Sequence, residues 1–204
     1  MTKRFLALVA CVSMCGPALL ALDSNANPAL KLEPPPKEVQ MRDGGFRLGP
    51  RTKIFVQLGH QSEDRIAAET LAEEIQDASG IRLDIIGMKA AAKAEDGAIV
   101  LARLQDSRVR SFLAQNGLRA DEAVGQSGYL LFSDHSHLIV AANSGEGLFY
   151  GVQTLRQLLR PAGKGLICPA VGIRDWPTLQ RTLPGLTEED QPSIAKSEGH
   201  APRA

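Results

Sequence analysis

Aromatic side chains are scarce in this sequence, at 4% of its 204 residues, and the formal net charge is zero. A surface that stacks bases or sugars needs aromatic rings, so the composition does not favour one. A neutral chain also lacks the basic field that attracts nucleic acid, and we therefore expect no nucleic-acid partner. With 44% hydrophobic and 23% charged residues, the chain has the composition of one globular domain with extensions at its ends.

Cysteines are equally few. The sequence contains three, and two of them, Cys11 and Cys15, lie in an apolar N-terminal segment. If that segment is removed, Cys168 is the one cysteine that remains, which excludes an internal disulfide. Its neighbours Ile167 and Pro169 predict a small buried apolar side chain rather than a nucleophile.

The N-terminus has the parts of an export signal. A basic pair precedes the apolar run FLALVACVSMCGPALLAL, and a small-x-small cleavage pattern ends at Ala26. Because Gly16 and Pro17 interrupt the run and no basic flank follows it, residues 1–26 are predicted to be a cleaved signal peptide, so the mature protein would have no membrane span. Export to the periplasm or the medium follows, and a lipoprotein anchored at Cys11 is the alternative.

The rest of the chain divides into three parts. Residues 27–37 form a Pro-rich lead-in, residues 38–181 have the pattern of a folded domain, and the polar residues 182–204 predict a disordered tail. Within the domain, apolar runs between turn residues predict strands in EVQM, GFRL, KIFVQL, RLDII, GAIVLARL, GYLLFS and LIVAA, and one or two further strands in LICPAVGIRDWP. Two main helices accompany them, with a shorter helical segment in SRVRSFLAQNG. This order predicts an α+β fold, a mixed sheet with the two helices packed on one face in two layers.

The first main helix is expected over residues 62–78. Its acidic start, Glu63 and Asp64, suits the positive end of the helix dipole. The expected buried stripe consists of Ile66, Leu71, Ile75 and Ala78. The acids on the other face are interpreted as solvated rather than metal-binding, namely Glu69, Glu73 and Asp77.

The stretch GEGLFYGVQTLRQLL, residues 145–159, follows a strand and opens the second helix, as glycines that bind nucleotide phosphates do. However, Glu146 would repel an anion, and no acid follows at the distance that a ribose requires. We therefore expect no nucleotide cofactor, and a structural helix capped by Ser144. Its expected apolar stripe is Leu148, Val152, Leu155 and Leu159, widened by Phe149. The glycines that would allow it to approach a strand closely are Gly145, Gly147 and Gly151.

Two histidines, His135 and His137, have the H-x-H spacing that some zinc sites use. A zinc site needs a third protein ligand, and the pair falls at the tip of a predicted hairpin, so we interpret both as turn residues. His60 and His200 have no recognisable partner in the sequence and are expected on the surface. No metal is expected.

In this order, the segments resemble the N-terminal, non-catalytic domain (domain 2 type) of bacterial β-N-acetylhexosaminidases, glycoside hydrolase family 20. The resemblance covers Leu32 to Arg181 and is most specific in GLFYGVQTLRQLL followed by IRDWP. It implies a zincin-like α+β domain, a mixed sheet covered by two helices and attached to a (β/α)₈ barrel that performs the chemistry. In that family the substrate's own acetamido group attacks, assisted by an Asp-Glu pair of the barrel.

The motif that carries the Asp-Glu pair is absent from this sequence, so no catalytic residue is expected in this chain. Arg181 stands where the family has an arginine that reaches the terminal sugar, but Thr182 replaces the glycine that normally follows. The resemblance thus implies one candidate substrate-binding residue, Arg181. It implies an exported accessory domain truncated before its barrel, with a separately encoded barrel and an amino-sugar glycan as candidate partners. The alternative is a stand-alone periplasmic module that binds glycan or peptidoglycan.

Overall fold

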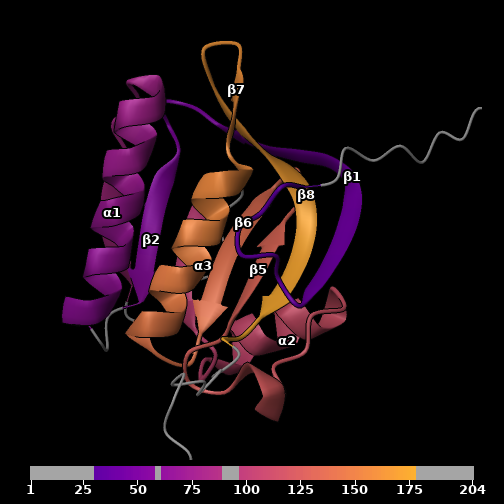
Figure 1. Cartoon of the computed structure of the whole chain (residues 1–204). Coiled ribbons are helices and arrows are strands. Elements are labelled where there is room, and N and C mark those ends of the chain that lie inside the picture. Colours follow the sequence, from indigo (N-terminus) through magenta and orange to yellow (C-terminus); the bar gives the residue numbers. More distant parts are fainter. Residues whose placement is uncertain (1–29, 58–60, 89–96, 178–204) are drawn as a thin grey trace, which may run out of the picture. The chain divides into compact units, whose positions relative to one another are not determined.

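The structure, a computed structural model, describes residues 30–57, 61–88 and 97–177 (Figure 1). The predicted signal peptide and C-terminal tail lie outside these residues. The elements follow one another as β1 (Glu38–Leu48), β2 (Lys53–Gln57), α1 (Gln61–Ser79), β3 (Asp84–Met88), β4 (Ala98–Arg103), α2 (Ser107–Gln115), the 3₁₀ turn η1 (Glu122–Val124), β5 (Tyr129–Ser133), β6 (His137–Ala142), α3 (Gly145–Leu158), β7 (Arg160–Ala162) and β8 (Gly165–Asp175). The described residues from Leu32 onwards form one unit.

One mixed sheet of eight strands forms the centre of this unit. Seven strands follow the order β1-β8-β5-β6-β4-β2-β3, and the short β7 pairs with β8. Strand β2 runs parallel to β3 and β4, and β4 runs parallel to β6. Strand β5 is antiparallel to β6 and β8, and β1 is antiparallel to β8. The predicted α+β class with a mixed sheet is confirmed.

Strand β1 unites the two short strands predicted in EVQM and GFRL. Its pairing with β8 shifts register between Met41 and Gly45, so the residues between them form an irregularity within one strand. Gly44 has a φ of 92°, a conformation that glycine adopts without strain. The Asp-Gly-Gly sequence therefore makes a bulge rather than the turn that its composition suggested.

Helices α1 and α3 lie side by side on one face of the sheet, as predicted (Figure 1). An ion pair of 2.6 Å between Glu74 and Arg156 joins them across their exposed side. The shorter helix α2, capped by Asp106, contributes to a core on the opposite face. Its buried residues Val109 and Leu113 belong to a cluster with strand residues, among them Phe55, Ala98, Val100, Leu130, Phe132 and Ile139. The sheet is therefore covered on both faces, and its strands are apolar on both sides.

The buried stripe of α1 differs from the predicted one. Leu71 and Ile75 are fully buried, but Ile66 is 58% exposed and Ala78 is exposed as well. The stripe that meets the sheet consists of Asp64, Ala67, Ala68, Leu71 and Ile75. At 100° per residue these positions share one side of the helix, and Ile66 lies far from its centre. Small alanines bring the helix close to the strands, and a charged residue occupies its first buried position.

The stripe of α3 was predicted more accurately. Leu148, Val152 and Leu155 are buried, but Leu158 takes the place expected for Leu159. Leu159 is the C-cap, with the extended backbone angles φ −66° and ψ 132°, so its side chain no longer follows the helical stripe. Phe149 does not widen the stripe. It lies on the side of α3 that faces away from the sheet and is 37% exposed.

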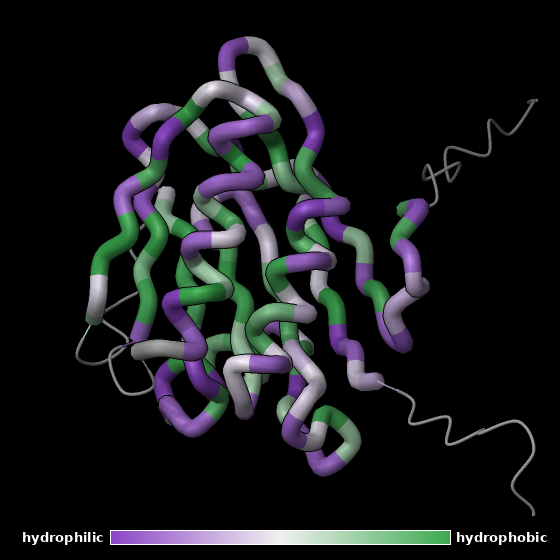
Figure 2. The backbone as a smooth tube through the Cα atoms, turned by 60° about the vertical axis from the view of Figure 1, so that its left-hand side comes forward, coloured by the Kyte–Doolittle hydropathy of each residue, from purple (hydrophilic) through white to green (hydrophobic). Residues whose placement is uncertain are grey.

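Hydrophobic residues are concentrated along the strands, while hydrophilic residues mark the loops at both ends of the sheet (Figure 2). Among the described residues, no helix has the length and the apolar content needed to cross a membrane.

Candidate functional site

The glycine-rich start of α3 was the strongest motif of the sequence, and the structure gives each glycine a packing role. A Cβ atom on Gly145 would lie 2.4 Å from Cβ of Glu63 on α1, and one on Gly147 would lie 2.5 Å from the carbonyl oxygen of Gly128. A Cβ on Gly151 would lie 2.4 Å from Cγ1 of Val140 on β6. Side chains at these positions would push the helix away from its neighbours. The predicted close approach of this helix to the sheet is confirmed.

The N-terminus of α3 is also closed by polar groups. The Ser144 hydroxyl accepts a hydrogen bond of 3.1 Å from the Gly147 amide and donates one of 2.7 Å to the Gln126 carbonyl. Glu146 in the first turn accepts from the Ser127 hydroxyl at 2.6 Å. With two carboxylates, Glu63 and Glu146, at this end, the helix dipole is already matched by negative charge. The predicted cap is confirmed, and the geometry does not form a phosphate cradle.

A buried ion pair that was not predicted from the sequence lies near the same edge of the sheet. Asp64, in the first turn of α1, is 0% exposed, and Arg103, at the end of β4, is 4% exposed. Two hydrogen bonds join them, Nε to Oδ2 at 3.0 Å and Nη2 to Oδ1 at 2.6 Å. The remaining Nη1 group donates to the Asn143 carbonyl at 2.9 Å, and Nη2 also reaches Glu63 at 3.3 Å. Four of the five N–H groups of the guanidinium have protein acceptors, so this cluster joins α1 and the segment before α3 to the sheet.

The two histidines of the H-x-H motif are separated by the hairpin geometry. His135 is exposed in the turn, whereas His137 is the first residue of β6. His137 Nδ1 lies 3.2 Å from both carboxylate oxygens of Asp134. Burial alone would raise the pKa of Asp134, but the backbone amides of His137 and Ser136 and the His137 ring outweigh it and lower that pKa. Within the described ranges, no three His, Cys, Asp or Glu side chains are placed to hold a metal ion.

Cys168 is fully buried on β8, as predicted. Burial raises the pKa of its thiol to about 12, an effect that the nearby Ser133 hydroxyl and Arg160 only partly offset. A thiol that stays protonated at neutral pH is a poor nucleophile, which agrees with a packing role.

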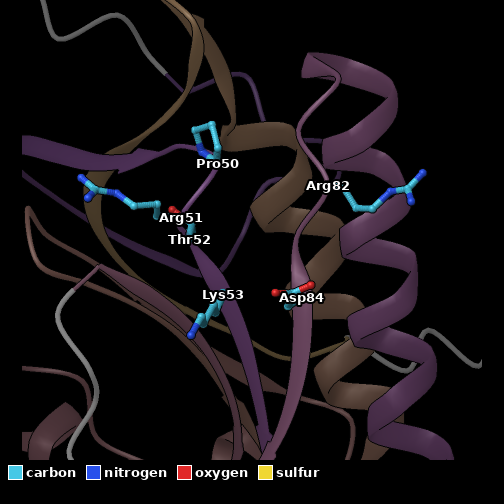
Figure 3. Close-up of a pocket in the computed structure, with 6 residues that line it drawn as sticks. All are labelled: Pro50, Arg51, Thr52, Lys53, Arg82 and Asp84. Atoms are coloured by element: carbon cyan, nitrogen blue, oxygen red, sulfur yellow. The ribbon is translucent and has the colours of Figure 1, made fainter.

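A shallow hollow of about 450 Å³ lies at the amino ends of β2 and β3 (Figure 3). Its lining consists of Pro50, Arg51, Thr52, Lys53, Arg82 and Asp84. Arg51 and Arg82 point away from one another (Figure 3). The Thr52 hydroxyl accepts a hydrogen bond of 3.1 Å from the Gly49 amide. Asp84 is the one carboxylate of this lining, so the hollow does not contain the paired acids that glycoside hydrolysis commonly uses.

Three residues singled out in the sequence fall outside the described ranges, namely Arg181, His60 and His200. The structure therefore neither positions Arg181 nor brings it together with another candidate.

The fold defines the class of the protein, an α+β domain in which two helices cover one face of a mixed sheet. The family description "Glycosyl hydrolase family 20, domain 2" matches residues 29–176. The chain belongs to this family.

Solved structures of family 20 enzymes agree with this assignment. The β-N-acetylhexosaminidase of Streptomyces coelicolor A3(2) is 26% identical, with a TM-score of 0.52, over 70% of this chain and 25% of that enzyme. The N-acetyl-β-hexosaminidase of Streptomyces plicatus, solved with Thio-NAglucal, is also 26% identical over 70% of this chain and 25% of its own, with a TM-score of 0.51. The exo-β-N-acetylglucosaminidase of Vibrio harveyi shares the fold, with 17% identity and a TM-score of 0.51, over 71% of this chain and 18% of that one. This chain thus spans about a quarter of the length of each Streptomyces enzyme.

Proposed function

We propose that this chain is an exported, non-catalytic accessory domain of a β-N-acetylhexosaminidase-type glycoside hydrolase. In this proposal it stabilises or positions a catalytic barrel that is supplied by another polypeptide. The observation that carries the proposal is the match to domain 2 over residues 29–176, which corresponds to about a quarter of the related Streptomyces enzymes. Export is supported by the signal pattern of residues 1–26.

The polar groups of the described residues support a structural role. Arg103 and Asp64 satisfy one another in the interior, and Ser144 and Glu146 are engaged at the start of α3. A glycosidase needs an acid that protonates the leaving group, and the hollow in Figure 3 offers a single carboxylate, Asp84, on an open surface. A barrel partner would supply the missing acid.

The direct test is an assay of the purified chain with a chromogenic N-acetylglucosaminide, with the Streptomyces coelicolor enzyme as the positive control. We expect no turnover above the level of a mock purification. Turnover that co-purifies with the chain through a second chromatography step would contradict the proposal.

A second assay separates a scaffold from a glycan-binding module. Calorimetry with chitobiose and with muropeptides is expected to give no saturable heat, because Arg51 and Arg82 of the open hollow in Figure 3 point away from one another. Saturable binding that Arg181→Ala abolishes would instead identify a binding module that uses this arginine.

A further inference from the structure

Basic side chains gather at one end of the sheet, in the hollow of Figure 3. Its lining contains three cations, Arg51, Lys53 and Arg82, and one carboxylate, Asp84. All four of these residues are exposed. No ion pair between described residues includes any of the three cations. A hollow in which unpaired positive charge prevails attracts anions.

A fourth cation, Lys164, belongs to the same end. It is exposed in the turn between β7 and β8, and the next residue, Gly165, lies against segments that border the hollow. A Cβ atom on Gly165 would collide with the carbonyl oxygen of Leu48 and lie 3.7 Å from Cδ1 of Ile81. Leu48 ends β1 just before the hollow, and Ile81 directly precedes Arg82. We call the four cations the basic end, namely Arg51, Lys53, Arg82 and Lys164.

Strand directions show which end of the sheet this is. Strands β2 and β3 are parallel, and β4 and β6 run in the same direction as β2. Strand β8 is antiparallel to β5, which is antiparallel to β6, so β8 also runs in this direction. The basic end therefore lies where β2, β3 and β8 begin. Helix α2 starts after the carboxyl end of β4, and Figure 1 shows it at the opposite end of the sheet from the β7–β8 turn.

The chain enters the folded unit at the end where the basic end lies. The unit starts at Leu32, which is buried, and Glu33 exchanges hydrogen bonds of 2.8 and 3.0 Å with the side chain of Gln157. Gln157 belongs to the last turn of α3. Because α3 starts after the carboxyl end of β6 and runs back along the sheet, its last turn lies toward the amino ends of these strands.

This entry point has a consequence during the expected export. Nine residues, 23–31, separate Leu32 from the apolar run of residues 5–22. At no more than about 3.6 Å per residue, they reach about 32 Å. A run that enters a membrane as a signal sequence therefore keeps Leu32 within about that distance of the bilayer. The end of the sheet that contains Leu32 and the basic end is the one presented to the lipid headgroups.

The spread of the cations suits many separate anions rather than one. Arg51 and Arg82 point away from one another, so they do not converge on a single small anion (Figure 3). The exposed carboxylates in the adjoining segments are Asp77 and Asp84, so the four cations of the basic end outnumber them. A layer of anionic headgroups offers each long basic side chain a partner of its own.

We propose that the basic end docks this domain on a bilayer surface that is rich in anionic lipid headgroups. The inference goes beyond the proposed function and shares with it only the expected export. In the docked state the headgroup phosphates meet the four cations, while the opposite end of the sheet, with α2, faces away from the bilayer. Because the attraction acts over about a Debye length, added salt weakens it.

The test is flotation of the exported chain with vesicles of phosphatidylglycerol and phosphatidylcholine in equal parts, compared with vesicles of phosphatidylcholine alone. We expect partition into the anionic vesicles, weakened by about tenfold or more in Arg51→Glu/Arg82→Glu. The matched control, Arg108→Glu/Arg119→Glu, makes the same change of charge on and just after α2, where both side chains are exposed. At an ionic strength of about 0.15 M the Debye length is about 8 Å, so the control is expected to change partition by less than about twofold. Thermal melting checks that each variant remains folded.

The other results overturn the inference. Equal partition into neutral and anionic vesicles, or into neither, would show that headgroup charge does not hold the chain. Equal losses in the two double variants would mean that net charge, and not the basic end, is responsible. Tighter binding to soluble inorganic polyphosphate than to the vesicles would assign the basic end to a soluble polyanion. None of these results affects the hydrolase assay, so the proposed function stands or falls separately.

Discussion

Asp64 and Arg103 form a two-point ion pair inside the domain, with hydrogen bonds of 3.0 and 2.6 Å. The pair joins the first turn of α1 to the end of β4, and the same arginine holds the Asn143 carbonyl before α3. Three elements that are far apart in the chain therefore meet at one guanidinium.

Replacement of Asp64 by Asn is expected to destabilise the domain strongly. The substitution leaves the Arg103 cation buried without its main counter-ion, and breaking such a pair costs about 3–5 kcal/mol. Urea unfolding followed by circular dichroism measures the change in the free energy of unfolding. The control Glu73→Gln, exposed on the same helix, is expected to change it by less than about 0.5 kcal/mol. Equal, small effects of both variants would show that the pair contributes little.

Gly147→Ala tests the close packing of α3. The new Cβ would lie 2.5 Å from the Gly128 carbonyl oxygen and 2.9 Å from Cβ of Ala142. Overpacking of this kind costs about 1–3 kcal/mol, and we expect it to exceed the gain of up to about 1 kcal/mol that alanine brings in helix propensity. The control is Gly49→Ala, where a Cβ has no atom within 4 Å. A more stable Gly147→Ala variant would contradict the packing role.

Ser144→Ala tests the cap of the same helix. Removal of the hydroxyl leaves the Gly147 amide without its acceptor and is expected to lower the free energy of unfolding by about 1 kcal/mol. Ser144→Asp keeps an acceptor and should restore part of the loss. Ser111→Ala, exposed on α2, serves as the matched control. If Ser111→Ala lowered the free energy of unfolding as much as Ser144→Ala does, the capping hydrogen bond would not explain the loss.

The buried thiol predicts a specific dependence of stability on alkaline pH. Burial raises the pKa of Cys168 from 9.0 to about 12. The unfolded thiol ionises near its ordinary pKa while the folded thiol does not, so the stabilising contribution is complete below pH 9.0 and declines as the pH rises toward 12. The decline approaches about 1.4 kcal/mol per pH unit.

This dependence is measured as the free energy of unfolding between pH 8 and pH 10.5 for the wild type and Cys168→Ala. The alanine variant is expected to show a shallower decline. The decline that remains includes a contribution from Tyr129, because burial also raises the pKa of its hydroxyl. Identical slopes in the two proteins would mean that the thiol ionises as easily in the folded state as in the unfolded state.

Local signals carried much of the fold. The cap at Ser144, the stripe of Leu148, Val152 and Leu155, and the hairpin around Asp134 were predicted from neighbouring residues and are confirmed. Each depends on contacts within a few positions of the chain, where periodicity and capping chemistry are informative. The predicted burial of Ile66 and Ala78 was wrong, because the orientation of α1 is set by the strands beneath it.

The residues of the candidate site were harder to predict from the sequence. Asp64 was interpreted only as an acid that suits the helix dipole, and Arg103 was not singled out within its predicted strand. Their separation of 39 residues carries no periodic signal, so only the parallel order of β2, β4 and β6 brings them together. A polar residue on the sheet side of a helix, facing a charge at a strand end, was the one signal that could have indicated the pair.

By itself, the sequence determined most elements of this protein, the capping of α3, the need for glycine in its first turns and the family to which the chain belongs. These properties reside in short segments whose backbone preferences and apolar periodicity are independent of distant residues. The tertiary structure decided which face of α1 is buried and that Asp64 pairs with Arg103. Those outcomes depend on strand order and register, which join residues that are far apart in the chain.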